Sequence, residues 1–123
     1  MNKDLNKNKR VFFEEFSQEN DSIVKKDDII NQIKDVYDPE IPVNIYDLGL
    51  IYQININDKN EVQITMSLTS PNCPVAESLP QNVAQKVKKN VIGMKNLSLY
   101  LTFEPPWDQN MMSEDAKLAL DIP

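Results

Sequence analysis

The feature that most constrains the fold is an alternation of apolar and polar side chains in three stretches of the chain. Apolar residues occupy every second position over residues 50–56, 62–68 and 97–103. A period of two over such lengths is typical of strands that bury one side only. Strands of an all-parallel sheet are usually apolar on both sides. The pattern therefore predicts a three-stranded antiparallel or mixed sheet with helices packed on one face.

Helices are predicted before, between and after these strands. The first begins at Asp27 or Asp28, either of which can cap it, and it ends before Pro39. The second has an apolar residue at every fourth position, a main body from about Pro80, and a left-handed cap at Gly93. A short helix ends the chain, which gives the order α-β-β-α-β-α in a two-layer α/β (α+β) domain.

The composition is that of one small domain preceded by an arm. A chain of 123 residues with 41% hydrophobic residues can bury a core without disulfides. Residues 1–26 are mostly polar, and residues 11–13 and 16 form their main apolar cluster. We therefore expect a flexible N-terminal arm at residues 1–26, dispensable for folding, and a single domain at residues 27–123.

Charge and missing residue types exclude several functions. The net charge of -6 argues against binding a nucleic-acid backbone. The sequence has no histidine, the usual general base and commonest zinc ligand, and its two glycines provide no phosphate-binding loop. No stretch approaches the roughly 20 apolar residues of a membrane span. One cysteine forms no internal disulfide, so we expect a cytoplasmic protein that does not enter a membrane.

The only cysteine lies in the segment TSPNCP, residues 69–74, between the second strand and the second helix. Pro74 suits the first helical position, which would place Cys73 at the helix cap, near the positive end of the helix dipole. The pKa of a thiol there is expected to be lowered, and the thiolate is the form that binds metals and attacks sulfur. Hydrolysis by this thiol is not expected, because the chain has no imidazole to act as base.

Two loops are candidates for supporting the cysteine segment. The loop over residues 38–47 contains two prolines and carries Glu40 and Asp47, which either position the cysteine segment or are simply solvated. After the third strand, Trp107 lies in a proline-containing loop and is either a lid over a neighbouring loop or a part of the core. Ser113 is then expected to cap the last short helix.

Three segments stand out together: DPEIPVNIYDLGLIY at residues 38–52, TSPNCP at residues 69–74, and EPPWDQNMMSEDAK at residues 104–117. In order and spacing they resemble the SufT-like and PaaD-like family of metal-sulfur cluster assembly proteins. The resemblance covers residues 27–123. It departs from the family pattern at residues 108–110, where a Ser or Thr is expected after the tryptophan, and at residues 120–122, where Leu-Gly-Ile is usual.

The resemblance implies an accessory factor in the maturation of iron–sulfur proteins rather than an enzyme. It implies a transient iron–sulfur cluster or iron as cargo, with an assembly scaffold or carrier and client apoproteins as partners. By motif, Glu40 matches the acid of Asp-Pro-Glu, and Asp47 matches the acid of Asp-Leu-Gly. Thr69 and Cys73 match the two ends of Thr-x-x-x-Cys-Pro, and Ser70 lies between them.

The sequence leaves the role of the single thiol open. A cluster normally takes four protein ligands, so Cys73 alone does not hold a stable one. It is a transient ligand, one half of a site shared in a homodimer, or part of a surface that contacts no metal. In the last case the chain is a protein interaction module whose binding surface is the polar side of the sheet, formed by Gln53, Asn55, Gln63, Thr65, Ser98 and Tyr100.

Overall fold

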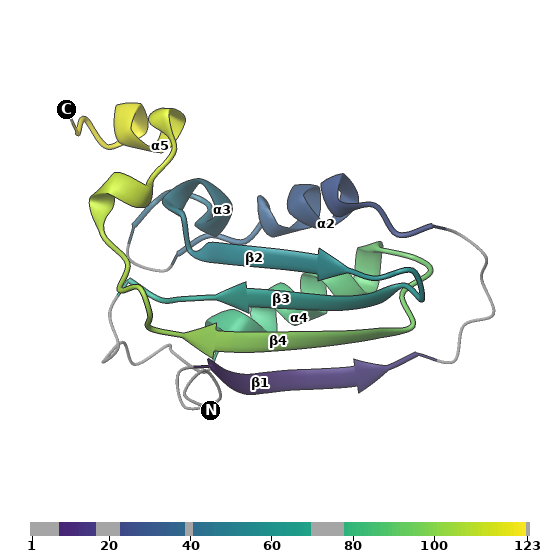
Figure 1. The fold of residues 1–123 in the computed structure, drawn as a ribbon. Helices are drawn as coiled ribbons and strands as arrows, with labels where there is room; N and C mark the ends of the chain where they lie inside the picture. The colour runs from purple at the N-terminus through teal and green to yellow at the C-terminus, as the bar shows by residue number, and fades with distance from the viewer. Residues whose placement is uncertain (1–7, 17–22, 39–40, 70–77, 123) are drawn as a thin grey trace.

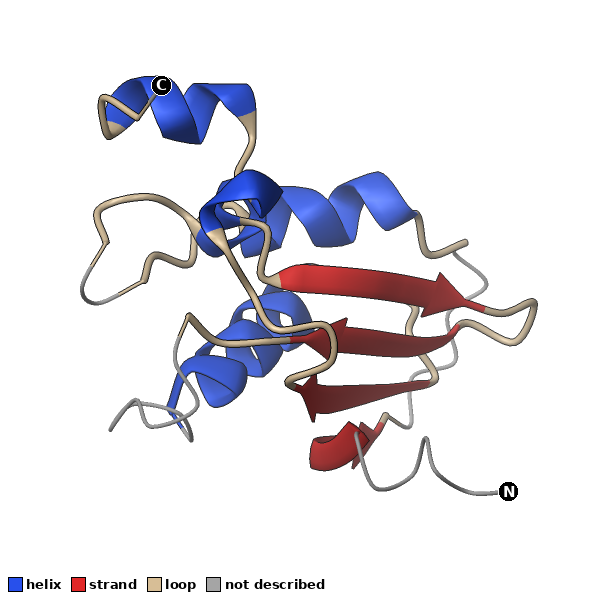
Figure 2. Ribbon diagram, turned by 60° about the vertical axis from the view of Figure 1, so that its left-hand side comes forward, coloured by secondary structure: helices blue, strands red, loops and turns tan. Residues whose placement is uncertain are grey.

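The computed structural model describes residues 8–16, 23–38, 41–69 and 78–122. Its elements are β1 (Asn8–Glu15), α2 (Lys26–Ile33), α3 (Ile45–Leu48), β2 (Ile51–Ile56), β3 (Glu61–Met66), α4 (Ser78–Asn90), β4 (Asn96–Thr102), the 3-10 turn η1 (Gln109–Met111) and α5 (Glu114–Ala119). Helices α2 and α4 lie on one side of a single sheet (Figures 1 and 2). The predicted two-layer α+β class is confirmed.

The sheet has four strands in the order β1-β4-β3-β2. Strand β2 is antiparallel to β3, β1 is antiparallel to β4, and β3 is parallel to β4. The parallel pair requires a crossover connection, which α4 provides. As a result β3 and β4 end, and β2 begins, at the same end of the sheet (Figure 1).

Strand β1 corrects two predictions, the three-stranded sheet and the flexible arm over residues 8–15. It pairs with β4 along its whole length, and the register shifts between Arg10 and Phe12. This bulge places Phe12 against the core, while Arg10 and Phe13 line a hollow on the opposite face of the sheet. The bulge hid the strand from sequence analysis, because Val11, Phe12 and Phe13 form a continuous apolar run without a period of two.

Helix α4 also holds β1 in place. The amide Nε2 of Gln81 donates to the carbonyl oxygen of Val11, the bulge residue, at 3.2 Å. The Lys88 ammonium forms an ion pair with Glu14 at 2.9 Å. Residues 8–15 are thus a part of the folded sheet, and the proposed domain boundary at residue 27 stays a prediction.

A second bulge, in β2, corrects the predicted faces of that strand. Ile51 pairs with Met66 and Gln53 with the residue before Met66, so Tyr52 is the extra residue. Strict alternation had placed Ile51 on the polar side with Gln53. In the structure Ile51 packs against the core, and the Tyr52 hydroxyl donates to the Pro105 carbonyl oxygen at 2.7 Å.

The core lies between the sheet and the two long helices. Its fully buried side chains come from alternate strand positions and from one face of each helix, as the periodicity predicted. Among the largest are Ile29, Ile33, Ile64, Val83, Val87, Leu97 and Leu99. The other side of the sheet is polar.

Helix ends follow the sequence in part. Helix α2 begins after Lys25 without a side-chain cap, and the predicted cap residues Asp27 and Asp28 lie in its first turn, where the helix dipole favours acids. Helix α4 ends at Asn90 rather than at Gly93, although Gly93 does have a left-handed φ of 100°. Ser113 caps α5 as predicted.

In the described part of the chain, each helix is too short or too polar to cross a bilayer.

Candidate functional site

The loop end of the sheet is formed by residues 36–38, 41–50, 67–69 and 103–113 (Figure 1). These segments are joined by hydrogen bonds between backbone groups. The Ser67 N–H donates to the Leu50 carbonyl at 2.8 Å, and the Ser113 N–H donates to the Asp47 carbonyl, also at 2.8 Å. The three predicted site residues that the structure describes, Asp47, Thr69 and Trp107, lie in this region.

Asp38 holds the first of these loops. It is buried, with 9% of its surface exposed, and its Oδ1 accepts a hydrogen bond from the Ile41 N–H at 3.0 Å. Its own N–H donates to the Val43 carbonyl at 3.3 Å, which closes the turn. Sequence analysis treated Asp38 only as the end of a helix, although an Asp in front of Pro commonly starts such a turn. Glu40, the acid predicted to act here, lies outside the described residues.

Asp47 lies in α3, a four-residue helix that sequence analysis read as part of a loop. Asn44 is its N-cap: the Asn44 Oδ1 accepts from the Asp47 N–H at 2.9 Å, and the Asn44 Nδ2 donates to the Asp47 Oδ2 at 2.8 Å. This reciprocal pair resembles a capping box. Asn44 was missed, and the signal that would have found it is an Asn followed three residues later by an acid. One carboxylate oxygen of Asp47 therefore serves α3 itself.

Gly49 ends α3 and sets how closely the C-terminal segment can approach. Its φ of 87° is in the left-handed region, which an L side chain rarely adopts. A Cβ at this position would collide with the carbonyl oxygen of Met111. The position therefore requires glycine for two reasons, backbone conformation and space.

Trp107 fastens the same segment to α3. Its indole Nε1 donates to the Leu48 carbonyl oxygen at 2.6 Å, and its half-buried ring packs against the core. Asp108, where the sequence departs from the family pattern, caps η1 by accepting from the Asn110 N–H at 2.7 Å. The structure thus brings Trp107 next to the helix that carries Asp47. Its role as a lid over the cysteine segment stays a prediction.

Thr69 is half-buried and lies two residues beyond Ser67, where β3 has ended. No hydrogen bond links Thr69 with Asp47 in the structure, which describes both residues. Ser70 and Cys73 lie outside the described residues. Within residues 8–16, 23–38, 41–69 and 78–122, no three His, Cys, Asp or Glu side chains are grouped so that they could hold a metal ion.

The fold is a small α+β domain with a mixed sheet, and the described parts of the first and third sequence motifs lie at one end of that sheet. The family model described as "Iron-sulfur cluster assembly protein" matches residues 26–99. The chain belongs to this family, and the resemblance to SufT-like proteins seen in the sequence is confirmed.

Named relatives and a solved structure agree with this assignment. The chain is 48% identical to the Fe-S protein maturation auxiliary factor of Porphyromonas gingivalis, covering 82% of this chain and 95% of the relative. It is 33% identical to the auxiliary factor SufT of Staphylococcus aureus, covering 71% and 98%. A DUF59 domain from Bacillus anthracis, titled a domain of unknown function, superposes with a TM-score of 0.75 at 33% identity, covering 80% and 92%.

Proposed function

We propose that this chain is an accessory factor in iron–sulfur cluster assembly that matures iron–sulfur proteins, and that it is not itself an enzyme. The observation that carries the proposal is the family match over residues 26–99. Relatives named as Fe-S protein maturation auxiliary factors support it, since the alignment with one of them spans 95% of that relative. The absence of histidine from the whole sequence supports the non-enzymatic part, because acid–base catalysis would lack its commonest group.

In this proposal a cluster or iron is cargo, and Cys73 is its ligand on this chain. Cys73 carries the only thiol, whereas a cluster normally has four protein ligands. The remaining ligands come from a scaffold, a client or a second copy of the chain, so that binding is transient or shared. In this proposal the loop end is the fixed support for the cysteine segment. Trp107 and Ser113 fasten the C-terminal segment to α3. Strand β3 ends nearby at Met66, four residues before Ser70.

The partners follow from the function at a coarse level. A maturation factor interacts with iron–sulfur assembly proteins, and we propose that these include a scaffold or carrier and the client apoproteins. We place this exchange in the cytoplasm, where reducing conditions keep a lone thiol free. A homodimer with one Cys73 from each copy would supply two thiolates.

The test combines metal analysis with client activity. Wild type and Cys73→Ser are purified without oxygen, iron and sulfide are measured, and client iron–sulfur enzymes are assayed in cells at matched protein levels. Cys73→Ser should abolish bound iron and lower client activity. Lys89→Gln, on an exposed position of α4, is the matched control and should change neither. Normal client activity with Cys73→Ser would overturn the ligand role.

Asp47→Asn tests whether the loop end works as a unit. If Asp47 supports the cysteine segment, this change should impair client activity about as much as Cys73→Ala, and the double variant should be scarcely worse, because groups acting together are not additive. The capping bond to Asn44 offers the competing explanation, in which stability falls by about 1 kcal/mol and activity falls only with protein level. Thermal unfolding on the same variants separates the two.

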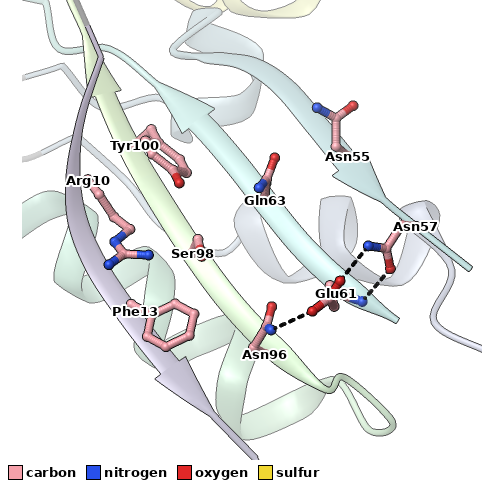
Figure 3. A pocket seen from close by; sticks show the side chains of 9 residues that line it. All are labelled: Arg10, Phe13, Asn55, Asn57, Glu61, Gln63, Asn96, Ser98 and Tyr100. Carbon is pink, nitrogen blue, oxygen red and sulfur yellow. Dashed lines mark hydrogen bonds between the residues drawn. The ribbon is translucent and has the colours of Figure 1, made fainter. Parts of the chain in front are cut away.

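A protein interaction module without metal chemistry is the second candidate. The observation that favours it is a hollow on the polar side of the sheet, opposite α2 and α4 (Figure 3). Client maturation that depends on the chain but is unchanged in Cys73→Ser would support this candidate.

A further inference from the structure

The polar side of the sheet contains a shallow hollow of about 260 Å³. It faces away from the two long helices, and all four strands or their ends contribute to it (Figure 3). Its lining residues are Arg10, Phe13, Asn55, Asn57, Glu61, Gln63, Asn96, Ser98 and Tyr100. The lining thus has one guanidinium and one carboxylate, and amide and hydroxyl groups make up most of the rest.

The carboxylate of Glu61 marks one end of the hollow and is held in a fixed direction. The Asn57 Nδ2 donates to one of its oxygens at 2.7 Å, and the Asn96 Nδ2 donates to the other at 3.1 Å (Figure 3). These two bonds lower the pKa of Glu61 below its ordinary value. Glu61 is therefore a negative charge at neutral pH, and its position is set by two neighbours.

Arg10 supplies the opposite charge at another corner. Its guanidinium lies over the Phe13 ring, with 4.7 Å from the guanidinium carbon to the ring centre, a cation–π arrangement. Among the described residues no carboxylate forms an ion pair with it. Arg10 and Phe13 both belong to β1. Strand β1 lies outside residues 26–99, the part of the chain that matches the family model, so the side of the hollow that these two residues form lies outside the matched region.

Between the two charges the hollow offers uncommitted hydrogen-bonding groups. The side chains of Asn55, Gln63 and Tyr100 form no hydrogen bond with any other described residue. Amide side chains donate and accept at once, which suits the alternating N–H and C=O groups of a peptide backbone. The floor of the hollow is therefore complementary to a polar, extended chain.

The distance between the charges decides the size of the ligand. Arg10 pairs with Tyr100 on β4, and Tyr100 pairs with Thr65 on β3. Arg10 is therefore two strand spacings from Thr65, and Glu61 lies four residues from Thr65 along β3. Strand spacing and rise then give a Cα separation of about 16 Å. A single amino-acid zwitterion is shorter than this Cα separation, although the Arg10 side chain extends over Phe13 and brings its charge closer to Glu61. An extended peptide, at about 3.3 Å per residue, spans the separation with about five residues.

We propose that this hollow binds an extended polar segment of a partner protein, which places an acidic side chain against Arg10 and a basic side chain about four residues away against Glu61. Charge complementarity selects this occupant over an apolar helix, since Phe13 is the only purely hydrocarbon side chain in the lining. The proposal is independent of the cysteine segment and does not rest on the cluster-assembly role.

The test is an NMR titration of the full ¹⁵N-labelled chain with the acetylated, amidated pentapeptide Asp-Thr-Asn-Thr-Lys and its reversed sequence. Binding of either peptide should move the amide signals of Gln63, Ser98 and Tyr100. Arg10→Gln and Glu61→Gln should each weaken binding about two- to fivefold, as loss of one exposed ion pair predicts. Lys89→Gln, on the helical side, should leave affinity unchanged.

Several outcomes would overturn the proposal. No shift with either peptide, or equal binding of the uncharged peptide Asn-Thr-Asn-Thr-Gln, would contradict charge-directed recognition. Equal shifts on adding free lysine or aspartate would indicate a small zwitterion site. Shifts that develop in the same residues on raising protein concentration alone would indicate a second copy of the chain. Because client activity is not measured, these results are separate from those on Cys73.

Discussion

The loop end and the hollow are built from different kinds of contact. At the loop end, segments far apart in sequence are joined by hydrogen bonds to backbone carbonyls, from the Trp107 indole to Leu48 and from the Ser113 N–H to Asp47. In the hollow, the bonds join side chains, and they are concentrated around Glu61. Backbone contacts fix a geometry, whereas free amides adapt to a ligand. The first region is suited to holding a reactive group, and the second to recognising a chain.

Among the variants that test this comparison, Gly49→Ala at the loop end is expected to have the largest effect on stability. The substitution imposes a left-handed φ on an alanine and forces its Cβ into the Met111 carbonyl. We expect the free energy of unfolding to fall by about 3 kcal/mol, from backbone strain and overpacking together. Urea unfolding measures it, with Gln85→Ala on the exposed side of α4 as a control that should change little. A loss below about 1 kcal/mol would show that the C-terminal segment is only loosely held.

Phe12 and Phe13 compare the two faces of one strand. Phe12 packs against the core, whereas Phe13 is 44% exposed and lines the hollow. We expect Phe12→Ala to cost about 2 kcal/mol and Phe13→Ala about 0.5 kcal/mol. Equal losses in urea unfolding would contradict the bulge that separates the faces.

The same strand tests the predicted domain boundary. Sequence analysis predicted that residues 1–26 are dispensable for folding, whereas the structure pairs residues 8–15 with β4. Deleting residues 1–16 should therefore lower the unfolding midpoint at least as much as Phe12→Ala does. An unchanged midpoint would support the predicted boundary at residue 27.

Trp107→Phe sharpens the description of the loop end. It removes the indole donor and leaves the Leu48 carbonyl without this partner, so we expect a loss of about 1 kcal/mol. Tyr52→Phe removes a comparable bond to the Pro105 carbonyl, but that bond is exposed and should contribute about 0.5 kcal/mol. Unfolding curves that rank the two variants in the opposite order would contradict the importance given to Trp107.

The smallest effect concerns the pH dependence of the hollow. The amide of Asn57, and then that of Asn96, lower the pKa of Glu61 in the folded state, so these bonds stabilise the fold above the unfolded pKa. The contribution is lost as pH falls through the lowered folded pKa. A ¹³C titration of the carboxyl group should show this, and Asn57→Ala should raise the pKa more than Asn96→Ala. A Glu61 pKa that is the same in all three proteins would contradict the fixed carboxylate.

Most of the fold could be predicted because period and spacing are properties of local sequence. Strands β2, β3 and β4, helices α2 and α4, and the Ser113 cap all follow from such patterns. Bulges were the main source of error, since one extra residue in β1 and one in β2 shift the faces that alternation assigns. Helix α3 was missed because four residues between a proline-containing loop and Gly49 leave no period to detect.

The sequence indicated candidate residues for the site but not their contacts. The motifs directed attention to Asp47 and Trp107, and the structure places both at the loop end. Their bonding partners, the Asn44 amide and the Leu48 carbonyl, depend on how distant segments pack, which no local pattern specifies. Sequence analysis named the polar side of the sheet as an alternative binding surface, but the hollow and its wall from Arg10 and Phe13 required knowledge of β1.

The pairing of β1 with β4 has a consequence for synthesis of the chain. Strand β1 is synthesised before the other strands of the sheet, and its partner β4 is synthesised last. At about 5 to 20 residues per second, the delay between the two strands is several seconds. Throughout that interval the apolar run over residues 11–13 has no partner strand. Lys9, Arg10, Glu14 and Glu15 flank the run on both sides, and charges in such positions hinder association between nascent chains. We therefore expect the charges of β1 to hinder aggregation of the chain before the sheet that contains them has formed.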